Sequence, residues 1–214
     1  NGSLKGYTES KEQKVKGGVE KKSLYVKRVG DLAFVQLGLD GFETLTPKQK
    51  VLAYHLTEAA KEGWDIYFQQ MHRYGLDIRN LLEEILIHPR QIDRTVLEKI
   101  HRYALRFWNM RGNHDMVTLR KFLPEFTPEE LVQAVKQAKW NGAFDSFGDE
   151  AALEDFLEEL HRTIFDPTFE PLRKETSPVI DKVVASAVNF YEGVTEKEVE
   201  SFKSRYLLNS RLVK

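Results

Sequence analysis

The residues best suited to chemistry lie in segment 108–115, which reads Trp-Asn-Met-Arg-Gly-Asn-His-Asp and separates two stretches of helical character. Asn109, Asn113 and His114 supply hydrogen-bond donors and acceptors. Gly112 lets a ligand backbone approach closely, and Asn and Gly tolerate left-handed backbone conformations. Loops of this kind carry function more often than helices do, so the segment is a candidate functional loop, with a plain helix–helix connector as the other interpretation.

A second candidate is segment 189–193, Asn-Phe-Tyr-Glu-Gly, which precedes a predicted helix start. Asn189, Tyr191 and Glu192 combine an amide, a phenol and a carboxylate within four residues. Segment 189–193 is therefore a second candidate functional loop.

Catalytic and metal-binding motifs are absent from this sequence. The six histidines are dispersed, with no pair at i, i+4 on a predicted helix, and there is no cysteine. Serine-hydrolase elbows, Walker loops and dinucleotide fingerprints are absent too. We therefore assign no catalytic residue and no metal ligand to these residues.

Composition excludes several classes of partner. The chain has 214 residues, 41% of them hydrophobic and 30% charged, and 32 basic residues balance 33 acidic ones. A net charge of −1 provides no global basic field for nucleic acid. No apolar run approaches the roughly 20 residues that cross a bilayer, so no membrane span is expected. The compartment stays open between cytoplasm and periplasm.

The elements that must position these residues are mostly helices. Capping boxes begin at Thr46, Thr127 and Thr195, and Ser177-Pro178 predicts another helix start. Asp77, Asp93 and Asp149 are further candidate caps. Apolar residues at helical spacing follow these starts, in the stretches 52–59, 78–85, 96–108, 131–138, 153–164 and 179–187.

The remaining sequence divides into a polar start and two extended regions. Residues 1–23 hold six lysines and four glycines, which predicts a flexible tail or linker. Residues 24–39 are rich in β-branched and aromatic side chains and predict one or two short strands. A terminal strand at 209–214 has no evident partner in sequence, which suggests a chain cut within a sheet. The fold class is mainly α (α+β), with residues 24–214 as one helical lobe.

Four segments in order resemble the dipeptidyl peptidase III family. They are residues 45–56, the loop 109–114 with 121–124 after it, residues 186–195 and residues 208–214. The similarity runs from about Leu32 to Lys214, and it resembles bacterial members.

The resemblance implies a zinc-dependent metallopeptidase, a hydrolase that removes dipeptides from the N-termini of short peptides. It places the zinc in another lobe, in a missing C-terminal catalytic part of the same polypeptide. It makes this chain the N-terminal helical part of the lower, substrate-binding lobe, ending in the first strand of a truncated β-barrel. The amine-binding residues would lie beyond residue 214.

With the resemblance, we expect two loops to face the substrate cleft of the intact enzyme and to bind substrate. An extended peptide loses water from its N–H and C=O groups on binding, and polar side chains in these loops would replace that water. The expected substrate-binding residues are Asn109, Gly112, Asn113 and His114, with Asn189, Tyr191 and Glu192 as the weaker group.

The alternative is a self-contained helical protein-interaction domain without catalytic activity. The terminal strand separates the two hypotheses, because a self-contained domain should not end in an unpaired Leu-Val-Lys strand.

We predict that this chain alone binds no zinc tightly and hydrolyses no dipeptidyl substrate. Zinc sites need about three or four convergent ligands, and the histidines here are dispersed with no cysteine to help. Isothermal titration calorimetry at neutral pH checks this. Stoichiometric, submicromolar zinc binding would contradict the prediction.

Overall fold

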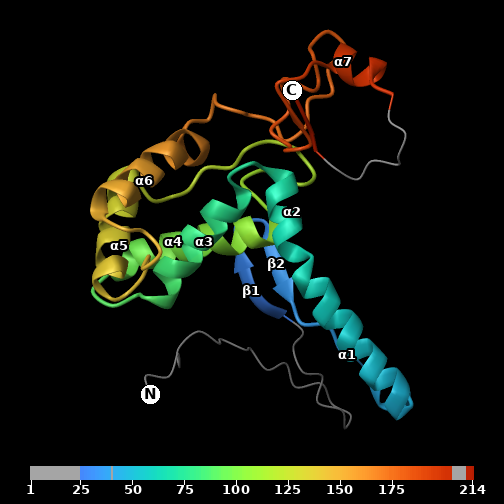
Figure 1. Cartoon of the computed structure of the whole chain (residues 1–214). Coiled ribbons are helices and arrows are strands. Elements are labelled where there is room, and N and C mark those ends of the chain that lie inside the picture. The colour runs from blue at the N-terminus through green and yellow to red at the C-terminus, as the bar shows by residue number, and fades with distance from the viewer. Residues whose placement is uncertain (1–24, 40, 204–210) are drawn as a thin grey trace. The chain divides into compact units, whose positions relative to one another are not determined.

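A computed structural model describes residues 25–39, 41–203 and 211–214 (Figure 1). It is mainly α with a few short strands, which confirms the predicted fold class. The predicted tail at 1–23 lies outside the described residues. The chain divides into two compact units, one ending at Ala59 and the other spanning Ala60–Lys214. None of the described helices is long and apolar enough to span a membrane.

The first unit contains a β-hairpin and most of one long helix. Strands β1 (Tyr25–Val29) and β2 (Leu32–Val35) pair antiparallel, which confirms the strands expected at 24–39. Gly30 makes the turn with a φ of +58°, a conformation that glycine adopts without steric cost. A 3-10 turn, η1 (Phe42–Thr44), leads to helix α1 (Pro47–Glu62), which starts where the Thr46 box predicts.

The second unit is built from six helices among its described residues. They are α2 (Trp64–Met71), α3 (Gly75–Ile87), α4 (Arg94–Met110), α5 (Pro128–Trp140), α6 (Glu150–Phe165) and α7 (Glu196–Ser201). Helix α3 packs against α2, α4 and α5, and α5 packs against α6. At the centre, the rings of Phe68 and Phe107 stack with centroids 5.8 Å apart, and both residues are fully buried.

Most helix starts lie where the sequence places them. The side chains of Asp93, Thr127, Asp149 and Thr195 each accept a backbone N–H of the first turn. The prediction for Asp77 is wrong, because α3 already begins at Gly75. The chain turns back so tightly there that a Cβ on Gly75 would lie 2.1 Å from the Phe68 carbonyl oxygen. Asp77 therefore sits inside the first turn.

The helix predicted after Ser177-Pro178 does not form. Residues 178–190 contain turns and irregular backbone instead. The Asp181 carboxylate accepts the N–H groups of Val183 and Val184 and also that of Glu196 from α7. Ala185 donates its N–H to the Asp181 carbonyl, one helical turn back, but Ala187 donates to the distant Leu172 carbonyl. The Asp181 side chain and this distant segment therefore take N–H groups that a continued helix would use.

The terminal strand has a partner, which corrects the expectation that it is unpaired. Strand β4 (Leu212–Val213) pairs in parallel with β3 (Tyr191–Glu192). The first residues of the predicted strand, 209 and 210, lie outside the described residues. The described strands form two two-stranded sheets and no closed barrel. The terminal strand consequently does not discriminate between the peptidase and the interaction-domain hypotheses.

We predict that Phe107→Ala lowers the free energy of unfolding by about 3–5 kcal/mol, because it leaves a cavity at the centre of the helical unit. Chemical denaturation followed by circular dichroism measures the change. Trp140→Ala is the control, since Trp140 is 82% exposed and should cost little. Equal losses in the two variants would contradict the assigned core.

Candidate functional site

A cleft of about 280 Å³ opens within the second unit, and we call it the polar cleft. Its walls come from the α2–α3 corner, the segment after α6, the irregular segment 183–195 and the chain beside β4. Five of its lining residues are charged or carry an amide: Arg73, Glu170, Asn189, Glu192 and Arg211. Regions far apart in sequence thus contribute to one hollow.

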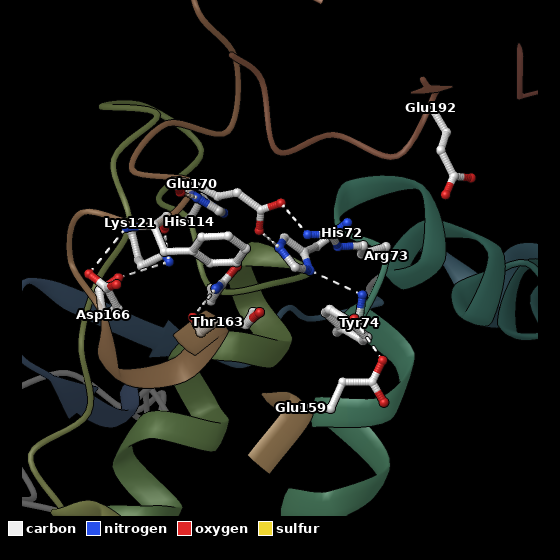
Figure 2. A network of polar contacts seen from close by, with 12 residues as sticks. His72, Arg73, Tyr74, His114, Lys121, Glu159, Thr163, Asp166, Glu170 and Glu192 are labelled. Atoms are coloured by element: carbon white, nitrogen blue, oxygen red, sulfur yellow. Dashed lines mark hydrogen bonds and ion pairs between the residues drawn. The ribbon is translucent and has the colours of Figure 1, made fainter. Parts of the chain in front are cut away.

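One wall of the polar cleft is an arginine–carboxylate pair. Arg73 Nη2 donates to Glu170 Oε1 at 2.9 Å, as Figure 2 shows. The Arg73 guanidinium also lies over the rings of Tyr74 and Phe169, at 5.2 and 5.9 Å from their centroids. A guanidinium held by a carboxylate and two aromatic faces is ordered before any ligand arrives.

Beneath this wall, buried His72 holds the other oxygen of the same carboxylate. His72 Nε2 lies 2.7 Å from Glu170 Oε2, and Nδ1 accepts the backbone N–H of Tyr74 at 3.1 Å. Because Nδ1 is an acceptor, we assign the ring proton to Nε2, which donates to Glu170. Burial alone would raise the pKa of Glu170, but the hydrogen bond from His72 and the nearby charges of Arg73 and Lys121 lower it below its ordinary value. Glu170 is therefore ionised at neutral pH.

The loop predicted to bind peptide faces inward. Asn113 is fully buried and its Nδ2 donates to the Thr163 carbonyl at 2.9 Å. His114 is 3% exposed and its Nε2 donates to the Glu170 carbonyl at 2.8 Å. Gly112 is buried, and Asn109 lies exposed in the last turn of α4. None of these four lines the polar cleft.

The second predicted segment does line the polar cleft. Asn189 is fixed to the end of α2, since its N–H and Nδ2 donate to the carbonyls of Gln70 and Gln69. Tyr191 is 38% exposed. Glu192 forms an ion pair with Arg211. The structure thus brings Asn189, Tyr191 and Glu192 together with Arg73 and Glu170.

Sequence reasoning missed the residues that build the wall. His72 was counted only among the six dispersed histidines, and Glu170 was not singled out. The only local signals are the polar His-Arg-Tyr run between two apolar stretches and a glutamate between Phe169 and Pro171. Glu170 adopts a φ of +48°, unusual for a residue with a side chain, which sequence does not reveal.

The resemblance places its zinc in another lobe, and the described residues offer no second site for such an ion. No group of three or more His, Cys, Asp or Glu able to hold a metal occurs in the described ranges. His72 and His114 come closest, with ring centroids 6.1 Å apart. His72 directs its Nε2–H at the Glu170 carboxylate, and His114 directs its Nε2–H at the Glu170 carbonyl. Because these two nitrogens are hydrogen-bond donors, they are not metal ligands.

No protein-family model matches this chain, and no curated protein matches it. The resemblance to dipeptidyl peptidase III therefore rests on the four sequence segments alone. Independently of that resemblance, the polar cleft presents fixed guanidinium, carboxylate and amide groups to a ligand with both donors and acceptors.

We predict that His114 makes folding stability fall as pH decreases. Burial lowers its pKa from 6.5 to about 4, so between these values the unfolded chain binds a proton that the folded chain does not. The stabilisation is complete above pH 6.5 and is lost progressively toward pH 4, by at most about 3 kcal/mol.

Denaturation midpoints between about pH 4 and 7 measure this effect. His114→Gln keeps a donor for the Glu170 carbonyl but does not titrate, so its pH dependence should be shallower. Identical slopes in both proteins would show that His114 does not carry the effect.

Proposed function

We propose that this chain forms part of the substrate-binding lobe of a dipeptidyl-peptidase-III-like zinc exopeptidase, and that its polar cleft binds the peptide. One observation carries the proposal. Asn189, Tyr191 and Glu192, which belong to one of the segments that resemble the family, line a cleft with Arg73 and Glu170.

The charges of the cleft suit a short peptide. Arg73–Glu170 and Arg211–Glu192 place two arginine–carboxylate pairs along the walls. The Arg73 side chain is 46% exposed and has only one nitrogen bonded to Glu170, so further guanidinium donors remain for a peptide carbonyl or a terminal carboxylate. A peptide carries the backbone donors and acceptors that such walls satisfy.

In this proposal Asn113 and His114 position the cleft and do not contact the substrate. His114 holds the carbonyl of Glu170, and Asn113 anchors the loop to the end of α6 through Thr163. They keep Glu170 where it orders Arg73. Gly112 closes the end of α4, where its N–H donates to the Phe107 carbonyl, and Asn109 lies exposed in the last turn of that helix.

Hydrolysis would belong to residues outside this part of the protein, where the resemblance places the zinc. Arg73, Glu170, Asn189 and Glu192 bind and orient a peptide. They do not form a metal centre, and no chemical step is assigned to them.

We predict that the chain binds tetraalanine with a free N-terminus. NMR chemical-shift titration measures this binding, and the backbone amide peaks of Arg73 and residues 189–193 should shift as the peptide is added. Arg73→Ala should weaken binding about ten- to hundredfold, since it removes a charged hydrogen bond worth about 1.5–3 kcal/mol. Glu192→Gln should also weaken it, by removing the partner of Arg211.

The matched control is Arg90→Ala, which removes an exposed arginine outside the cleft and should leave affinity unchanged. If tetraalanine does not bind, or binds Arg73→Ala as tightly as the parent, the cleft is not a peptide site. The helical interaction domain would then be the better hypothesis.

A further inference from the structure

A larger hollow of about 570 Å³ lies elsewhere in the second unit, and we call it the acidic groove. Its walls are α3, the connection between α5 and α6, and the first half of α6, elements that lie together in Figure 1. It shares no lining residue with the polar cleft. Its size is within the range of protein ligand sites.

The floor of the acidic groove is aromatic. The rings of Phe147 and Phe156 lie 5.0 Å apart, and those of Phe144 and Phe147 lie 6.3 Å apart. Phe147 and Phe156 are only partly buried, so part of this apolar surface stays in contact with water. Such a floor can take up the aliphatic part of a side chain.

The rim of the groove carries four carboxylates, and neither lysine nor arginine lines it. Glu83 faces Arg79 at 3.6 Å and Glu84 faces His88 at 3.5 Å. Asp77 and Asp145 have no ion-pair partner among the described residues.

The charged form of the Asp77 carboxylate is disfavoured by its surroundings. Asp77 is partly buried, and this burial together with the charge of Glu159 raises its pKa. A cation entering the groove would relieve this repulsion, whereas an anion would add to it.

We propose that the acidic groove is a docking site for a lysine- or arginine-bearing segment of another polypeptide. The cationic head pairs with Asp77 and Asp145, and its methylene stem lies over the Phe147 and Phe156 rings. Charge complementarity selects this occupant, because an apolar segment alone would leave both carboxylates desolvated and unpaired. This proposal depends neither on the proposed peptidase function nor on ligand binding in the polar cleft.

Two fluorescein-labelled peptides of alternating sequence test the proposal by fluorescence anisotropy on the whole chain. One contains leucine and lysine, and the other has glutamate in place of lysine. The lysine probe should bind, and the double variant Asp77→Asn/Asp145→Asn should weaken binding at least about tenfold. The control Glu158→Gln/Glu200→Gln makes the same change in net charge at exposed residues outside the groove and should leave affinity within about twofold.

Asp145→Asn alone, in an exposed turn, keeps the test valid if the change at Asp77 disturbs α3. It should weaken the lysine probe severalfold, whereas Arg73→Ala should not affect it. The proposal is overturned if the lysine probe does not bind, if the glutamate probe binds as well, or if the control loses as much affinity as the double variant. A negative result for the lysine probe would not change tetraalanine binding in the polar cleft, so the experiments distinguish failure of this proposal from failure of the peptidase proposal.

Discussion

Glu170 joins three parts of the helical unit through three hydrogen bonds. Its carboxylate accepts from His72 and Arg73 at the α2–α3 corner, and its carbonyl accepts from His114 in the loop after α4 (Figure 2). These bonds hold the residue at a φ of +48°, a conformation that side chains disfavour. Because Arg73 is ordered by this carboxylate, the wall of the polar cleft depends on the same junction.

Lys121 fixes the neighbouring backbone to the same junction. Its ammonium donates to the carbonyls of Asp166 and Phe169, just before Glu170. Partial burial lowers the pKa of Lys121, while the nearby carboxylates of Glu170 and Asp166 oppose that shift. Buried polar groups are costly unless bonded, so a network of this kind favours a single arrangement of the loops that it joins.

The two hollows differ in electrostatics although they belong to one unit. In the polar cleft each carboxylate has an arginine partner, Arg73 for Glu170 and Arg211 for Glu192. In the acidic groove Asp77 and Asp145 have no such partner among the described residues, and the floor is aromatic. A wall of arginine–carboxylate pairs suits a ligand with both hydrogen-bond donors and acceptors, whereas a wall whose carboxylates lack a cationic partner suits a cation. The near-zero net charge of the whole chain conceals this local difference.

The sequence by itself determined the local features: mainly helical structure, short strands within residues 24–39, and caps at Asp93, Thr127, Asp149 and Thr195. These depend on interactions over a few residues, such as a hydroxyl that accepts an N–H three positions away.

Tertiary structure decided the rest. The Asp181 carboxylate bonds to α7 where a helix was expected, β4 pairs with β3, and Asn113 and His114 turn inward while Asn189 and Glu192 line a cleft. His72 and Glu170 stand 98 positions apart, and a contact at that separation depends on the packing of the intervening helices, which local sequence patterns do not encode.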